Sequence, residues 1–199
     1  MSLEEEFKRI KEKHRKAIRT RVARVCFSGS TGRVFESRTS NKIEDRTSTK
    51  IKKVLLNIDI DHLLNIKSQE QFKKWFETNL DPVFNAIPEK TSHGNTISIG
   101  ARRWGYATKI LNLYLRDMVE NCRYFTYEQA ERVIKFLYVP FDRIVMGKLQ
   151  DSGVPLPFSQ INEIDTPDKF YSVQNLLEEG AQKAGVPRVW FDDNWGDRK

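Results

Sequence analysis

Cysteine is scarce in this chain of 199 residues: there are two, Cys26 and Cys122, far apart in the sequence. Neither has the short paired spacing that holds a zinc ion or forms a redox-active dithiol. The three histidines, His14, His62 and His93, are not spaced as metal ligands either. The sequence therefore predicts no metal site and no cofactor on these residue types. Two isolated thiols also favour a reducing, cytoplasmic compartment.

Long apolar runs are missing too. No stretch is long enough to cross a bilayer, and residues 1–9 lack the apolar run of a signal peptide, so we expect no membrane partner. The phosphate-binding pattern Gly-x-x-x-x-Gly-Lys-Ser/Thr and the nucleophile turn Gly-x-Ser-x-Gly do not occur. There is no internal repeat and no convincing strand run, which leaves an all-α fold as the prediction.

What the chain has in excess is positive charge, with 34 lysines and arginines against 27 acidic residues and a net charge of +7. A basic surface favours a polyanionic partner, and nucleic acid is the first candidate, although a merely solvated basic surface has the same composition. Hydrophobic residues make up 39% and aromatic residues 11% of the chain, enough for a core. The length suits one domain with an appended arm.

Basic residues are concentrated near the N-terminus. Residues 2–24 predict a helix with acidic residues in its first turn and basic residues in its later turns, and residues 28–50 predict a loop rich in small hydroxyl side chains. We therefore divide the chain into a basic N-terminal helix and flexible loop, 1–50, and a helical domain, 51–199. The cations here that we expect to contact phosphates are Lys16, Arg19, Arg33 and Arg38. A solvated helix face and a plain linker explain the same pattern.

Helix starts in the second region carry local capping signals. Ser68 and Thr126 are each followed three residues later by glutamine, which predicts capping boxes. Thr166-Pro167-Asp168 has the order that a helix start prefers, and that helix is expected to end near Gly185. The segment 186–195 is too aromatic for a disordered terminus and is expected to dock on the core.

A helix predicted at residues 104–116 is apolar on nearly every face, because its second half reads Ile110-Leu-Asn-Leu-Tyr-Leu115. A helix with so narrow a polar face is normally central rather than superficial. Its one lysine, Lys109, and Asn112 are therefore expected at or near the interior. A helix lysine commonly extends its ammonium to the surface, so a purely structural explanation of Lys109 stays open.

Asp142 is the second candidate catalytic group. It follows Val139-Pro140-Phe141 at the predicted start of a further helix, 33 positions after Lys109. A helix N-terminus favours a carboxylate charge, and a fixed carboxylate stabilises the positive charge that develops when a glycosidic bond breaks. A lysine in a low-dielectric pocket loses proton affinity, and its neutral amine can attack a sugar carbon. Together the two groups suit release of a base from deoxyribose, although Asp142 could also be only a helix cap.

Lys109 in an apolar helix, followed by Val139-Pro140-Phe141-Asp142-Arg143 at the start of another, resembles the helix-hairpin-helix superfamily of DNA glycosylases. The pattern is nearest the divergent archaeal 8-oxoguanine glycosylase branch, and the segment 191–195 is similar to that branch's closing aspartate-and-tryptophan segment. The resemblance covers roughly residues 97–195. It implies a compact helical domain in which Lys109 attacks the sugar C1′ and Asp142 activates that step or stabilises the oxocarbenium ion.

The chain departs from that family at the hairpin. The family's closely spaced glycines, whose amides bind a phosphate, are not present; instead Gly100 and Gly105 flank Ala-Arg-Arg-Trp. Arg102 and Arg103 are expected to substitute electrostatically at the DNA, together with Arg143. The basic N-terminal helix has no counterpart in the family.

The function predicted from these observations is a DNA glycosylase that extrudes a modified base from double-stranded DNA and cleaves its N-glycosidic bond. The substrate is an oxidised purine in repair or a modified base of phage DNA in antiviral defence, and abasic-site lyase activity stays open. We expect a monomer. The side chains expected to line the base pocket are Trp104, Tyr106, Asn112, Phe141 and Trp190, although each aromatic residue is also a candidate core residue.

Two alternatives belong to other classes. The first is a non-enzymatic nucleic-acid-binding module that uses the basic helix and the 28–50 loop for phosphates. The second, weaker alternative is a metal-dependent nuclease built on the short acidic pairs Asp59/Asp61 or Asp192/Asp193. Nothing in the sequence places either pair beside a lysine on a sheet, and such pairs are usually surface or cap residues.

Overall fold

The computed structural model describes residues 3–26, 35, 46–89, 100–121 and 124–197, and every regular element in these residues is helical. The predicted all-α class is therefore confirmed for the described part of the chain. The longer helices are α1 (Leu3–Val25), α3 (Thr47–Asn57), α4 (Gln69–Ala86), α5 (Arg103–Arg116), α6 (Tyr127–Ile134), α7 (Arg143–Asp151) and α8 (Pro167–Ala184). Shorter segments are η2 (Ile60–Asn65), η3 (Gly100–Arg102), η4 (Asp117–Asn121), η5 (Ile161–Glu163) and η6 (Arg188–Asp197).

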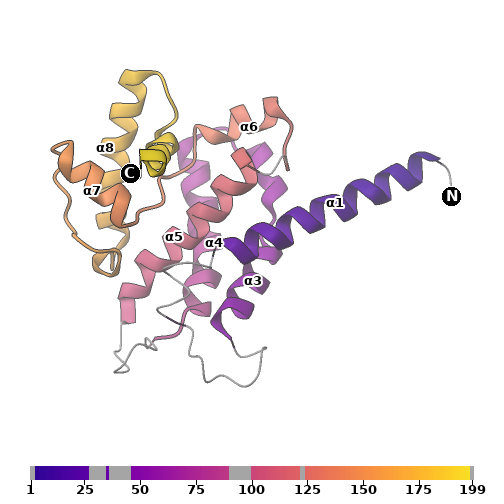
Figure 1. Ribbon diagram of the computed structural model, residues 1–199, viewed down its shortest axis with the longest axis horizontal. Helices are drawn as coiled ribbons and strands as arrows, with labels where there is room; N and C mark the ends of the chain where they lie inside the picture. Colours follow the sequence, from indigo (N-terminus) through magenta and orange to yellow (C-terminus); the bar gives the residue numbers. More distant parts are fainter. Residues whose placement is uncertain (1–2, 27–34, 36–45, 90–99, 122–123, 198–199) are drawn as a thin grey trace.

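Helix α5 is central, as its apolar pattern predicts. It packs against α4 and η5, and Figure 1 shows α1 and α3 on one side of it and α7 and α8 on the other. Ile110, Leu111 and Tyr114 are fully buried in the core. The expectation that Lys109 and Asn112 lie in the interior is also confirmed, because their exposed fractions are 8% and 2%. A central helix thus delivers two polar side chains into apolar surroundings.

The predicted capping signals begin the helices where expected. Thr126 and Gln129 form a complete capping box at α6. Thr166 accepts a hydrogen bond from the Lys169 amide at the start of α8, and Pro167 occupies the first helical position. The Ser68 hydroxyl accepts from the Gln71 amide at α4, but the Gln71 side chain accepts from the Lys67 amide, one residue before the cap.

One predicted element boundary was wrong. Helix α3 begins at Thr47, inside the stretch predicted to be a loop, and it spans residue 50, where we divided the chain. Thr47, Ile51 and Leu55 are buried at a spacing of four residues, so a core-facing helical stripe overrides the polar local composition. Helix α6 ends at Ile134, and Phe136 and Leu137, which follow it, are buried in the core. The remainder of the predicted loop lies outside the described residues, apart from Phe35 and Arg46.

Gly105 allows α5 to approach η5 very closely. A Cβ atom at this position would lie 2.0 Å from the Ile161 carbonyl oxygen, a distance that no side chain tolerates. The absence of a side chain at Gly105 therefore sets the spacing between the N-terminal turns of α5 and the segment that precedes α8.

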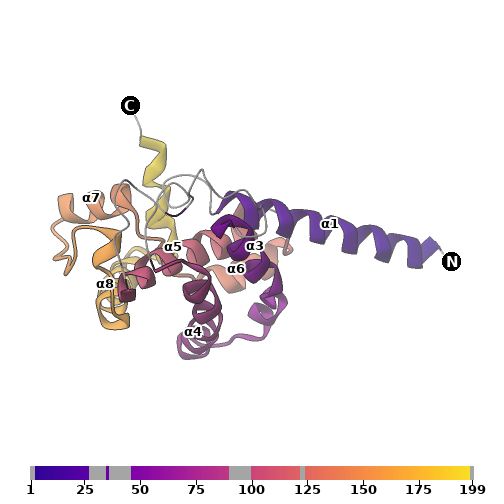
Figure 2. The same cartoon turned by 90° about the horizontal axis from the view of Figure 1, so that it is seen from below.

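Helix α1 projects beyond the rest of the fold at its N-terminal end (Figures 1 and 2). Its C-terminal half joins the core through Ile18, Val22 and Ala23 and packs on α3, whereas Phe7 near the projecting end is 63% exposed. Among the helices of the described residues, none combines the length and apolar content needed to cross a membrane.

Candidate functional site

The structure brings Lys109 of α5 and Asp142 at the start of α7 together. The Lys109 Nζ lies 3.9 Å from the Asp142 Oδ2, and the two residues are 8% and 7% exposed. A close pair of opposite charges this deeply buried is costly to desolvate, so its presence requires a structural or functional explanation.

The two oxygens of the Asp142 carboxylate have different tasks. Oδ1 accepts hydrogen bonds from the backbone amides of Ile144, at 2.8 Å, and Val145, at 3.0 Å, and thereby caps α7. Oδ2 lies towards Lys109. The cap fixes the carboxylate plane, because both amides belong to the first turn of the helix. One oxygen is therefore held by the helix, and the other faces the amine.

The segment before Asp142 is held by two side chains that sequence reasoning did not identify. Gln174 of α8 accepts from the Val139 amide at 3.0 Å and donates to the Val139 carbonyl at 2.8 Å. The Arg188 guanidinium donates to the carbonyls of Leu137 and Phe136, each at 2.9 Å. Both side chains are buried and satisfy backbone groups that no helix pairs. The sequence signal that could have identified Gln174 is its position among the apolar, core-facing residues of α8.

Burial lowers the pKa of the Lys109 ammonium below its ordinary value, because a charged amine is poorly solvated in the interior. The nearby carboxylates of Asp142 and then Asp192 favour the charged form and offset part of this effect. The amine therefore loses its proton more readily than a surface lysine does.

Asn112 lies one helical turn after Lys109 on α5, and residues three apart are neighbours on a helix surface. Its Nδ2 and Oδ1 are both buried, and neither has a hydrogen-bond partner among the residues that the structure describes. A buried polar group left unsatisfied costs about 1–3 kcal/mol. Asn112 thus presents an unused donor and an unused acceptor beside the Lys109–Asp142 pair.

Segment η6 is attached to the C-terminal end of α5, as expected for a tail that docks on the core. The Arg116 guanidinium forms ion pairs with Asp192, which is 2% exposed, and with Glu120. The Trp190 Nε1 donates to the Glu120 carboxylate at 3.0 Å. Asp192 is therefore part of the electrostatic surroundings of Lys109 while it anchors the tail.

The aromatic residues predicted to line a base pocket lie in different surroundings. Phe141 is buried and packs on Phe170, as does Trp104 from α5. Tyr106 packs edge-on against Phe35, and Trp190 is 43% exposed. The rings of Trp104 and Phe141 therefore belong to the aromatic core that supports α5 and the start of α7. Contact between these rings and an extruded base stays a prediction.

Four of the predicted DNA-contacting cations have described side chains, and these four fall into two groups. Arg103 donates to the carbonyls of Gly100 and Ile87 and lies over the Phe84 ring. Arg19 donates to the carbonyls of Leu56 and Ile58. These two arginines stabilise the fold, whereas Lys16 and Arg143 are exposed.

Three of the predicted cations cannot be placed. The Arg102 side chain, Arg33 and Arg38 lie outside the described residues.

Within the described residues, no group of three or more histidine, cysteine, aspartate or glutamate side chains is arranged to hold a metal ion. Asp61, from one of the acidic pairs, forms an ion pair with Arg15, and Asp192, from the other, pairs with Arg116. Asp193 has no described side chain.

Comparison of the chain with protein-family models, with curated proteins and with solved structures gave no match.

Proposed function

We propose that the protein is a DNA glycosylase that releases a modified base from double-stranded DNA. The observation that carries this proposal is the buried Lys109–Asp142 pair, with 3.9 Å between Nζ and Oδ2 and with the other carboxylate oxygen held by two amides of α7. The similarity to helix-hairpin-helix glycosylases rests on the same two residues.

In the proposed reaction, the bond between the sugar C1′ and the base nitrogen breaks, and its electron pair leaves with the base. The positive charge that develops on the sugar is stabilised by Asp142, whose orientation is set before the reaction by the helix cap. A carboxylate with one oxygen occupied by the backbone cannot easily rotate away. The geometry at Asp142 therefore suits electrostatic stabilisation of an oxocarbenium ion.

Lys109 has two proposed roles that lead to different products. If its neutral amine attacks C1′, the resulting iminium species can eliminate the 3′ phosphate, and the strand is cut. If Lys109 only positions a phosphate or a water molecule, water attacks C1′ and an abasic site remains. The lowered pKa of Lys109 supports the first role, because it increases the fraction of neutral amine.

Asn112 is proposed to recognise the extruded base. A primary amide offers one donor and one acceptor group in one plane, which matches the edge of a nucleobase. Its two unsatisfied atoms support this role, since a bound base would supply the missing partners. An oxidised purine in repair and a modified phage base in antiviral defence both present such an edge.

The proposal is tested on a panel of duplexes and modified phage DNAs, with strand breaks measured with and without alkali and with borohydride present. We expect alkali-dependent breaks that are lost in Asp142→Asn. Asp168→Asn is the matched control, because Asp168 is an exposed carboxylate in the first turn of α8. Borohydride trapping that disappears in Lys109→Gln would identify the lyase. Absence of base release from every DNA, with folded protein, would overturn the proposal.

A non-enzymatic nucleic-acid-binding module is the second candidate. The observation that favours it is an open hollow of about 750 Å³ beside α1, which among the described residues is lined by five cations and by no carboxylate. This class predicts DNA binding that survives Asp142→Asn together with no base release. The nuclease alternative predicts strand cleavage that EDTA abolishes.

A further inference from the structure

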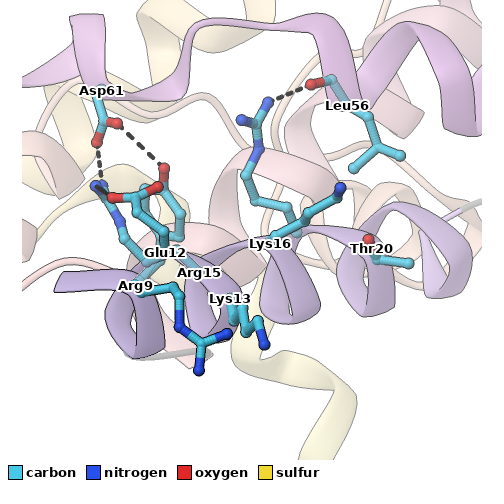
Figure 3. Close-up of a pocket in the computed structure, with 10 residues that line it drawn as sticks. Arg9, Glu12, Lys13, Arg15, Lys16, Thr20, Leu56 and Asp61 are labelled. Atoms are coloured by element: carbon cyan, nitrogen blue, oxygen red, sulfur yellow. Dashed lines mark hydrogen bonds and ion pairs between the residues drawn. The ribbon is translucent and has the colours of Figure 1, made fainter. Parts of the chain in front are cut away.

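Helix α1 is fixed to the fold by two arginines on one of its sides. Arg15 forms an ion pair with Asp61 and lies over the Tyr124 ring, 4.3 Å from its centroid, and Figure 3 shows Arg15 facing Asp61. Arg19, one turn later, donates to two carbonyls at the end of α3. These contacts hold the middle of α1 against η2 and the end of α3, so the helix presents its opposite surface in a fixed direction.

A second set of α1 side chains faces the hollow described above. Lys13, Lys16, Thr20 and Arg24 follow one another at intervals of three or four residues, which places them along one face of the helix. Lys52 of α3 lies on the same hollow. We call these five residues the basic stripe. A neighbouring hollow of about 510 Å³ shares Lys13, Lys16 and Thr20 with it, so the two hollows adjoin.

The cations of the basic stripe are not neutralised by the protein. Lys13, Lys16 and Arg24 are exposed and Lys52 is half-buried, and within the described part of the chain none of the four forms a hydrogen bond or an ion pair. Such charges in close proximity repel one another unless an anion binds between them. A cluster of lysines and arginines with a hydroxyl donor is the side-chain composition that contacts nucleic-acid phosphates.

The dimensions of the basic stripe suit an extended polyanion rather than a single small anion. Residues 13 to 24 span about 16 Å along a helix, at 1.5 Å per residue. One strand of B-DNA advances about 3.4 Å per nucleotide, so the basic stripe matches roughly five nucleotides.

We infer that the basic stripe binds the sugar-phosphate backbone of DNA, as a second contact separate from the Lys109–Asp142 pair. In Figures 1 and 2, α1 and α7 lie on opposite sides of α5, so this contact lies away from the carboxylate at the start of α7. The inference rests on the proposed function only in taking DNA as the partner. The basic stripe adds affinity that is independent of base sequence, and its contribution disappears with a duplex too short to reach it.

The test compares two variants with the same loss of charge. Lys13→Gln/Lys16→Gln/Lys52→Gln removes three cations of the basic stripe, and Lys67→Gln/Lys74→Gln/Lys183→Gln removes three exposed lysines elsewhere. The affinity for an unmodified duplex of about 30 base pairs is measured between 50 and 200 mM salt. The slope of log affinity against log salt should fall by about 0.9 for each phosphate that is no longer neutralised, hence by about 2.7, and affinity at low salt should fall roughly tenfold or more.

The inference predicts that the control variant keeps the wild-type slope and that both variants keep the wild-type unfolding temperature. Equal slopes for the two variants would overturn it and leave the glycosylase proposal intact. Binding of phosphatidylserine vesicles by the wild type, with no binding of DNA, would overturn it as well. Conversely, the basic-stripe variant could show the reduced salt slope while the wild-type protein releases no base. That result would support the DNA contact and reject the proposed function.

Discussion

Asp142 divides its carboxylate between helix α7 and Lys109: Oδ1 accepts from two amides of the first turn, and Oδ2 lies 3.9 Å from the Lys109 Nζ. Stability and proposed chemistry therefore depend on different oxygens of one side chain. Substitutions that keep the helix cap and remove the negative charge, or remove both, can separate the two roles of Asp142.

Asp142→Asn should remove activity and leave stability nearly unchanged, because asparagine is as good a helix cap as aspartate. Its amide oxygen can accept from the same two backbone amides, but the negative charge is lost. Asp142→Ala should lower the free energy of unfolding by about 0.5–2 kcal/mol, since it removes the cap. Urea unfolding of both variants is the measurement. An Asn variant as unstable as the Ala variant would show that the charge, rather than the cap, stabilises the fold.

Lys109→Met should lower base release on the order of 10²-fold or more if the amine reacts, without lowering stability at pH 7. Burial lowers the pKa of the ammonium, so the folded protein holds this proton less tightly than the unfolded chain does. Between the folded-state pKa and the ordinary value of 10.5, unfolding takes up a proton, and the stability of the wild type rises with pH. The stability advantage of the Met variant should therefore shrink from pH 7 to pH 10 in urea unfolding. If Lys109→Met is clearly less stable than the wild type at pH 7, the direction of the Lys109 pKa shift is contradicted.

Asn112→Leu should stabilise the protein by about 1 kcal/mol and weaken the recognition of the base. Two buried unsatisfied atoms are replaced by the methyl groups of a side chain with the same branching, which removes their desolvation penalty. Thermal unfolding and kcat/KM are measured on the same preparation. Asn175→Leu, at an exposed position of α8, is the control for adding a leucine to a helix. A loss of stability at position 112 would mean that the amide is satisfied in solution.

Gly105→Ala should destabilise the fold by about 1–3 kcal/mol, because the new methyl group would overlap the Ile161 carbonyl and force backbone movement. Gly180→Ala provides the matched control. Nothing lies within 4 Å of a Cβ at Gly180 in α8, and alanine should stabilise that helix by up to about 1 kcal/mol. In chemical denaturation, the free energy of unfolding should fall for Gly105→Ala and rise for Gly180→Ala. Equal changes in the two variants would contradict the close approach of α5 and η5.

The parts of this structure that the sequence predicted depend on local patterns. The apolar residues around Lys109 predicted a central helix, and the spacing of Thr126 and Gln129 predicted a cap, because both signals lie within a few turns of one chain segment. The beginning of α3 was missed because Thr47 and its polar neighbours are helical through burial against distant residues.

The site itself was predictable only in part. Lys109 and Asp142 were proposed as partners from chemistry and from a family resemblance, but their separation depends on how α5 and α7 pack. Gln174 and Arg188, which hold the segment before Asp142, were not identified, since their partners are backbone groups 35 or more positions away in the sequence. DNA contact by Arg19 and Arg103 stays a prediction, because the sequence shows their charge but not the carbonyls to which they donate.

The central claim is that the buried Lys109–Asp142 pair releases a base from DNA. Mass spectrometry of free bases, after incubation of oxidised duplex and modified phage DNA with the wild type, Asp142→Asn and Asp168→Asn, tests it most directly. We expect one modified base to accumulate with the wild type and with Asp168→Asn, and to be absent with Asp142→Asn. Equal release by the Asp142→Asn variant, or none by the folded wild-type protein, would contradict the claim.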